Sequence, residues 1–199
     1  MPTEPRPPII LASGSPRRRD LLAADGFSVE VLPPDLDETA RPGETPDALV
    51  ERLAREKAAA IAVDREGIVV AGDTVVVLDD SILGKPTDDA DATQMLRALS
   101  GRTHTVLGGW CVRRGTQVLS GVERTEVRFR SLSESEIAAY VATGEPHDKA
   151  GAYGIQERGG AFVRAVTGSY DNVVGLPLAT VRSAIHAVTG RAEEGPAGP

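Results

Sequence analysis

The chain has 199 residues, is 41% hydrophobic and 26% charged, and carries a formal net charge of −7. This composition is ordinary for a soluble globular protein, no apolar run approaches the roughly 20 residues that span a membrane, and the acidic balance argues against a nucleic-acid-binding protein. The N-terminus has no basic-then-apolar signal pattern and Cys111 is the only cysteine, so we expect a cytoplasmic protein without internal disulfides.

Strand and helix patterns alternate along the chain. The expected strands are 7–13, 27–34, 67–78, 82–86, 102–115, 117–132 and 161–168. The expected helices are 16–25, 46–63, 88–100, 134–143 and 176–190. This alternation, with at least one hairpin, predicts an α/β fold built on a mixed twisted sheet with flanking helices. We expect a flexible N-terminus over 1–8, one domain over 9–190 and a disordered polar tail over 191–199.

The stretch LASGSPRRRDLL places three arginines directly behind Ser15 and Pro16. Serine and proline favour the start of a helix, so residues 17–19 fall in its first turn. The helix dipole disfavours cations there, yet a strand, a small-residue turn and a helix N-terminus together form an anion site. The pattern therefore favours a phosphate-binding corner, with Arg17 best placed and Arg19 on the surface. The alternative is that all three side chains simply extend into water.

Lys57 lies in the middle of the apolar face of the helix expected over 46–63. A buried ammonium is costly unless it is paired, so Lys57 either extends to the surface or points into a cleft. The chain has only three lysines among its 22 basic residues, and the other two are Lys85 and Lys149. Such scarcity indicates either sites that need a compact ammonium, as beside phosphates, or codon bias.

Asp73 interrupts the apolar strand expected over 67–78, where desolvation disfavours a carboxylate. Gly72 beside it indicates a bulge or the close approach of another group. Aspartates in this setting bind a metal, act as a base or cap a neighbouring backbone group.

The connection over 145–160 has almost no large apolar side chains, which predicts a segment without core residues. Loops of this length are often functional, and this one holds Asp148, Lys149 and Gln156. A flexible surface loop is the alternative.

Several common catalytic motifs are absent. The sequence has no GxxxxGK[ST] phosphate loop, no GxGxxG fingerprint and no GxSxG elbow, and its three histidines lack metal-ligand spacing. A nicotinamide enzyme, a serine hydrolase and a zinc enzyme are therefore disfavoured.

Taken together, the segments from about Ile10 to Gly190 resemble the Maf family of nucleoside triphosphate pyrophosphatases, also called septum-formation proteins. The motifs that carry the resemblance are LASGSPRR, DET at 37–39, REK at 55–57, GDTVVVLD, ILGKP, LSGRTH, DKAGAYGIQ and GSYDNVVGLPL. The resemblance implies an elongated fold with a central cleft, related to the inosine triphosphate pyrophosphatases and often homodimeric. It also implies hydrolysis of a nucleoside triphosphate to the monophosphate and pyrophosphate, with a divalent cation such as Mg²⁺ or Mn²⁺.

Motif by motif, the resemblance assigns roles to single residues. It implies that Asp73 is the catalytic carboxylate and that Glu38 joins it in holding the cation. It implies a phosphate-binding set formed by Ser13, Ser15, Arg17, Lys57 and Lys85.

Three residues, Arg17, Thr74 and Gln156, match the branch that resembles dTTP/UTP pyrophosphatases, so dTTP and UTP are the expected substrates. The Gln156 amide has both a donor and an acceptor, which can complement the O4 and N3–H edge of uracil or thymine. A non-catalytic nucleotide-binding regulator of septum formation is the competing interpretation. A broader enzyme acting on modified pyrimidine nucleotides is a further alternative.

Overall fold

The computed structural model describes residues 8–62 and 67–190, and it confirms the expected α/β class. The strands are β1 (Ile9–Leu11), β2 (Val29–Val31), β3 (Ile68–Leu78), β4 (Ser81–Leu83), β5 (Thr103–Arg114), β6 (Gln117–Phe129) and β7 (Val163–Thr167). The helices are α1 (Pro16–Ala24), α2 (Pro46–Ala60), α3 (Asp89–Leu99), α4 (Glu134–Val141), α5 (Tyr170–Val174) and α6 (Leu178–Thr189). The expectations of a flexible N-terminus and a disordered tail concern residues that lie, apart from Pro8, outside the described ranges.

The seven strands form one mixed sheet in the order β2-β1-β3-β5-β6-β7, and β4 also pairs with β3. β1 runs parallel to both of its neighbours, whereas the pairings among β3 to β7 are antiparallel. Asp79 and Asp80 close the β3–β4 hairpin with positive φ angles of 48° and 64°. Two central residues with φ above zero are what a tight hairpin of the primed type requires, and aspartate tolerates this conformation.

The middle of β3 has a strand partner on one side only. On one edge β3 pairs continuously with β5, but on the other edge β1 pairs with residues 68–70 and β4 with residues 76–78. The Val70 carbonyl accepts from the Ala12 N–H on that second edge. Because main-chain groups alternate in direction along a strand, those of Gly72 and Thr74 point to the same edge. Residues 71–75 therefore form an open edge in the centre of the sheet.

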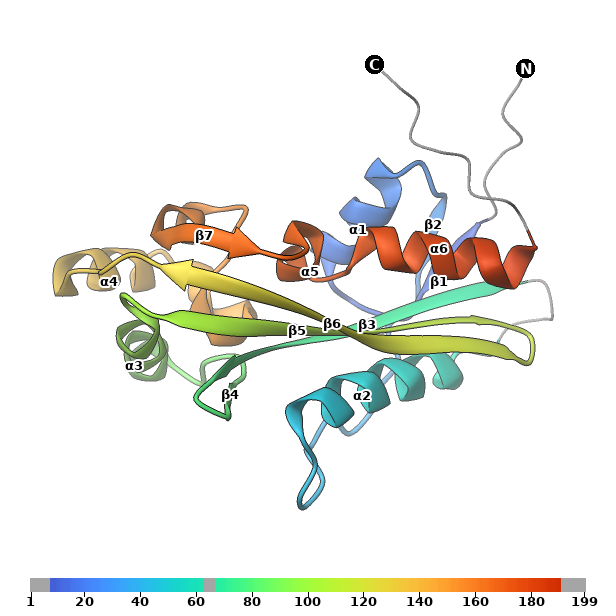
Figure 1. The fold of residues 1–199 in the computed structure, drawn as a ribbon, viewed down its shortest axis with the longest axis horizontal. Helices are drawn as coiled ribbons and strands as arrows, with labels where there is room; N and C mark the ends of the chain where they lie inside the picture. The colour runs from blue at the N-terminus through green and yellow to red at the C-terminus, as the bar shows by residue number, and fades with distance from the viewer. Residues whose placement is uncertain (1–7, 63–66, 191–199) are drawn as a thin grey trace.

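Two adjacent glycines of β5 bring helices onto the sheet directly opposite this open edge. Gly109 and Gly108 pair in register with Asp73 and Thr74. A Cβ on Gly109 would lie 2.0 Å from the Val50 carbonyl oxygen of α2, and one on Gly108 would lie 1.9 Å from Asn172 Oδ1 of α5. Successive strand residues face opposite sides, so the two helices touch opposite faces at one level of the sheet. Figure 1 shows α2 below the long strands and α5 and α6 above them.

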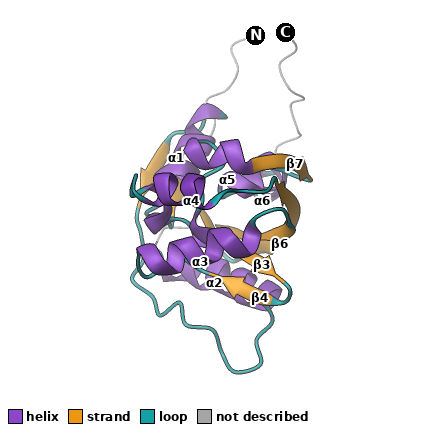
Figure 2. Cartoon of the chain, turned by 90° about the vertical axis from the view of Figure 1, so that its left-hand side faces the viewer, coloured by secondary structure: helices purple, strands orange, loops and turns teal. Residues whose placement is uncertain are grey.

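The pattern of buried residues matches this arrangement of a sheet with helices on both faces. β3 is buried along nearly its whole length, as its run of apolar residues predicts. The connection between β2 and α2 runs as a long loop on the side of the molecule that carries α2 (Figure 2). Within the described residues, none of the helices combines the length and apolarity needed to cross a bilayer.

The segment over 145–160 differs from its expectation. Three short 3-10 helices, η1 (Glu145–Asp148), η2 (Ala150–Ala152) and η3 (Arg158–Phe162), form most of this segment. Tyr153 is buried and packs edge-on against Phe129 with ring centroids 4.7 Å apart. The prediction of a segment without core residues was wrong, because one aromatic side chain is enough to anchor it.

Candidate active site

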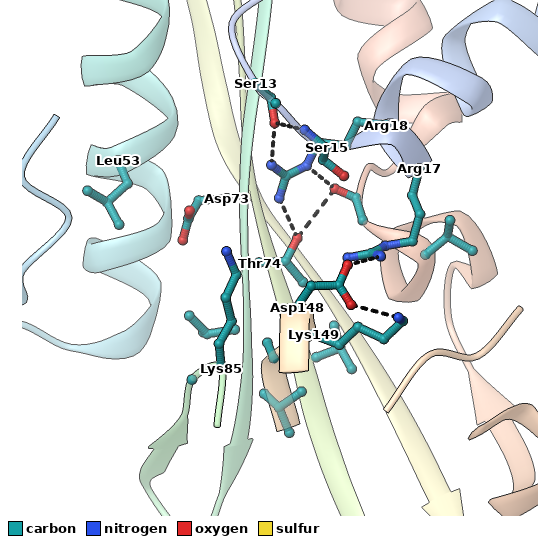
Figure 3. A pocket seen from close by; sticks show the side chains of 18 of the residues that line it. Ser13, Ser15, Arg17, Arg18, Leu53, Asp73, Thr74, Lys85, Asp148 and Lys149 are labelled. Carbon is teal, nitrogen blue, oxygen red and sulfur yellow. Dashed lines mark hydrogen bonds and ion pairs between the residues drawn. The ribbon is translucent and has the colours of Figure 1, made fainter. Parts of the chain in front are cut away.

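A cavity of about 800 Å³ lies at the open edge of β3. Its volume falls within the range of small-molecule sites, which is roughly 300–1,000 Å³. All the site residues expected from the sequence line this one cavity, namely Ser13, Ser15, Arg17, Glu38, Lys57, Asp73, Thr74, Lys85 and Gln156. The third lysine, Lys149, also lines it, so every lysine of the chain contributes to the same wall. Figure 3 shows several of these side chains converging from α1, β3 and the segment after α4.

Lys57 joins the two carboxylates that were expected to hold a cation. Its ammonium lies 2.7 Å from Asp73 Oδ1 and 2.8 Å from Glu38 Oε1. The Lys57 side chain is 8% exposed and that of Asp73 is 12% exposed, whereas Glu38 comes from the exposed loop before α2. Of the two alternatives for Lys57, the structure has the second, because the ammonium points into the cleft rather than to the surface.

The arginines of the opening stretch separate into three environments. Arg19 is exposed and pairs with its neighbour Asp20, as expected for a surface residue. Arg17 reaches across the cavity mouth and donates to Asp148 Oδ2 at 2.9 Å. Partial burial raises the pKa of Asp148, but hydrogen bonds from Lys149 and Arg17 outweigh this effect and lower it to about 2.

Arg18 was given no role by the sequence, and it is the buried member of the three. Its Nε donates to the Gly175 carbonyl at 2.8 Å, its Nη1 to Ser13 Oγ at 2.9 Å and its Nη2 to Thr74 Oγ1 at 2.9 Å. Burial lowers the pKa of Arg18, and the nearby negative charge of Asp73 opposes this shift. The guanidinium therefore links α1, β3 and the turn after α5 on one side of the cavity (Figure 3).

Other cavity groups remain available to a ligand. Within the described residues, neither Lys85 nor Gln156 has a hydrogen bond or ion pair, and both side chains are exposed. Ser15 begins α1 without a capping hydrogen bond from its side chain, and its N–H donates instead to Ser13 Oγ at 3.2 Å. The first turn of α1 also contains no acidic residue. The positive end of the helix dipole therefore faces the cavity without a negative side chain beside it.

Tyr153 lines the cavity, and a buried histidine contacts its hydroxyl. Its hydroxyl lies 2.9 Å from His104 Nε2. Burial lowers the pKa of His104 to about 4, so the imidazole is neutral at pH 7. Nothing in the described residues bonds His104 Nδ1, which is also buried. This ring is a structural support for the cavity wall and has no geometry for metal binding.

The side chains of the cavity supply only some of the oxygen ligands that a divalent cation needs. No group of three or more histidine, cysteine or acidic side chains gathers into a metal cage within the described residues. Asp73 and Glu38, however, approach one common point, because both contact the Lys57 ammonium. Mg²⁺ typically binds through one or two carboxylates and completes its shell with water and substrate phosphates. The two carboxylates fit that pattern.

Comparison with known proteins identifies the family. The family described as "Maf-like protein" matches residues 8–188, which is most of the chain. A protein of Shewanella denitrificans named "dTTP/UTP pyrophosphatase" is 52% identical over 189 residues, covering 90% of this chain and 95% of its own length. One of Anaeromyxobacter dehalogenans with the same name is 56% identical over 178 residues, covering 87% and 90%. The chain therefore belongs to the Maf family.

Among solved structures, the one titled "Structure of a HAM1 protein from Coxiella burnetii" aligns over 93% of this chain and 100% of that chain. Its sequence is 17% identical and its TM-score is 0.49.

Proposed function

We propose that the protein is a nucleoside triphosphate pyrophosphatase that hydrolyses dTTP and UTP to the monophosphate and pyrophosphate. The observation that carries the proposal is the convergence of a buried carboxylate, Asp73, with all three lysines of the chain in one cavity. The names of the similar Shewanella and Anaeromyxobacter proteins support the choice of substrate.

The reaction accumulates negative charge on phosphoryl oxygens while water attacks the α-phosphorus and pyrophosphate leaves. Fixed cations that stabilise this charge supply much of the catalysis in phosphoryl transfer. In our proposal, Lys57, Lys85 and Arg17 bind the triphosphate, and the hydroxyls of Ser13 and Ser15 donate to its oxygens. Lys85 is suited to this task, since in the described part of the chain it has no anionic partner to give up.

Asp73 is the proposed catalytic residue. Its carboxylate orients the attacking water and accepts a proton from it, a role for which an ionised side chain inside the cavity is required. The ion pair with Lys57 at 2.7 Å holds the carboxylate in place inside the cavity. When substrate enters, the Lys57 ammonium can exchange this contact for one to a phosphoryl oxygen, which leaves the carboxylate free to act.

Asp73 and Glu38 would hold the divalent cation, either Mg²⁺ or Mn²⁺, since both accept oxygen ligands. When bound, such an ion supplies charge stabilisation on the phosphoryl oxygens. The remaining task for the chain is selection of the nucleobase, which we assign to Arg17, Thr74 and Gln156. The Gln156 side chain has no competing partner in the described structure, so its amide is available to the Watson–Crick edge of a pyrimidine.

The test is pyrophosphate release from dTTP, UTP, CTP, GTP, ATP and 7-methyl-GTP with Mg²⁺ or Mn²⁺, using the wild type and Asp73→Asn. We expect turnover of dTTP and UTP that is lost in the folded variant. Near-normal turnover in Asp73→Asn would refute the assigned role of this residue. Binding of nucleotides without any turnover by the wild type would instead support the alternative, a non-catalytic nucleotide-binding regulator of septum formation.

A further inference from the structure

Arg18 controls which hydrogen-bonding groups its two hydroxyl neighbours can offer to a ligand. Its guanidinium is buried and binds Ser13 and Thr74 at the same time, at 2.9 Å each. We propose that Arg18 is a positioning residue that leaves Thr74 as a hydrogen-bond acceptor and Ser13 as a donor, so that Thr74 selects a nucleobase with an N–H at its Watson–Crick edge. The inference rests on the proposed function and deepens it.

The Thr74 hydroxyl has one proton and two lone pairs. The proton is directed to the Gly175 carbonyl, 3.3 Å away, and one lone pair accepts from Arg18 Nη2. One lone pair of the Thr74 hydroxyl oxygen remains for a ligand in the cavity, and it can only accept a hydrogen bond. Uracil and thymine carry a proton on N3, whereas N3 of cytosine is itself an acceptor. Thr74 in this state therefore favours the two imide pyrimidines and disfavours cytosine.

Ser13 is left with the opposite polarity. Its Oγ accepts from Arg18 Nη1 at 2.9 Å and from the Ser15 N–H at 3.2 Å, which occupies both lone pairs. The hydroxyl proton is then free to donate, and a donor is what a phosphate oxygen requires. One guanidinium thus prepares two different subsites, a donor for the anionic end of the ligand and an acceptor for its base.

Only an arginine can hold this arrangement. The planar fork presents Nε, Nη1 and Nη2 in fixed directions, and each of them has its own partner on a separate segment. A lysine at this position keeps the positive charge but has a single nitrogen. In Arg18→Lys the Thr74 hydroxyl is released from at least one constraint and can rotate to donate. The variant therefore separates the effect of charge from the effect of geometry.

The experiment compares kcat/KM for UTP and CTP in the wild type, Arg18→Lys, Thr74→Val and the double variant. We expect the UTP-over-CTP ratio to fall on the order of ten-fold in each single variant, the size expected for one hydrogen bond. We expect no further fall in the double variant, because both changes remove the same acceptor. Arg19→Lys, at the exposed neighbouring arginine, is the matched control and should keep the wild-type ratio.

Three outcomes would overturn the proposal. One is an equal loss of kcat/KM for both nucleotides in Arg18→Lys, which would indicate a direct contact between Arg18 and phosphate. Another is additive losses of the ratio in the double variant. The third uses only the wild type, so it stands even if the variants do not fold. UTP methylated at N3 has no proton for Thr74 to accept, so its kcat/KM should be at least about ten-fold lower than that of UTP. Equal turnover of the two nucleotides would refute the assignment of Thr74 as a hydrogen-bond acceptor. Failure of the wild type to hydrolyse UTP at all would refute the proposed function instead.

Discussion

The Lys57 ammonium lies 2.7 Å from Asp73 Oδ1 in the centre of the cavity, with both side chains largely withdrawn from solvent. The two residues come from α2 and β3, and they meet because α2 packs directly on the glycine of β5 that pairs with Asp73. Each charge offsets the energetic cost of burying the other, so the pair contributes to the stability of the fold as well as to the site.

Replacing Lys57 by methionine should therefore destabilise the protein as well as inactivate it. Loss of one partner leaves a buried carboxylate uncompensated, which costs about 3 kcal/mol in the free energy of unfolding. Urea denaturation of Lys57→Met against the wild type measures this cost. The double variant Lys57→Met/Asp73→Asn should recover much of the loss, since it removes the uncompensated charge, and a double variant as unstable as the single one would contradict the argument.

Gly109 should not tolerate a side chain. The added Cβ of Gly109→Ala would lie 2.0 Å from the Val50 carbonyl oxygen, which belongs to a helix backbone and cannot rotate away. We expect a loss of at least about 2 kcal/mol in stability, because overpacking forces α2 off the sheet. Gly84→Ala is the matched control. A Cβ there has nothing within 4 Å, so its midpoint of thermal unfolding should stay close to that of the wild type.

His104 should make the protein less stable in mild acid. Burial lowers its pKa from 6.5 to about 4, so between these values the unfolded chain binds a proton that the folded chain does not. Stability must then fall as the pH drops through this window, by about 2 kcal/mol between pH 7.5 and pH 5. Urea titrations at both pH values measure the slope. His104→Gln should lose this share of the slope, and identical slopes in the two proteins would refute the assignment.

Asp148 should compete with the nucleotide for Arg17. The pair is partly exposed, with 26% of the Arg17 side chain and 60% of the Asp148 side chain accessible, so the contact is weak enough to be displaced. Asp148→Asn removes the competitor, and we expect the KM for UTP to fall about two- to five-fold at low salt. Asp20→Asn, which removes the partner of the exposed Arg19, is the control and should leave KM unchanged. A higher KM in Asp148→Asn would show instead that the carboxylate assists binding.

Local patterns predicted the long elements and singled out Arg17, Lys57 and Asp73, whereas the roles of the other expected site residues came from the resemblance to the Maf family. A run of β-branched residues with one aspartate predicted β3, whereas the rarity of lysine left both a phosphate site and codon bias open. The position of Lys57 on an apolar helix face left two interpretations open, because a helical wheel does not show what packs against it. The contact with Asp73 decides between them.

The role of Arg18 could not be predicted, because its partners are set by tertiary structure alone. In the sequence it is the middle of three identical residues, and nothing local separates it from Arg17 or Arg19. The short α5 was likewise missed, since five residues are too few for a helical period to appear. The paired glycines 108 and 109 were a readable signal within a strand pattern, but their meaning depends on the two helices that touch them.

The hydrogen bond from Arg18 to the Gly175 carbonyl joins residues that are 157 positions apart, and the one from Arg17 to Asp148 joins residues 131 positions apart. The cavity wall is thus assembled from segments that lie far apart in the sequence. A nascent chain that has emerged only to the end of α4 already contains Asp73 and Lys57, yet it has neither of these closing contacts. The wall that carries Arg17 and Arg18 is therefore complete only when the residues up to Gly175 have been synthesised.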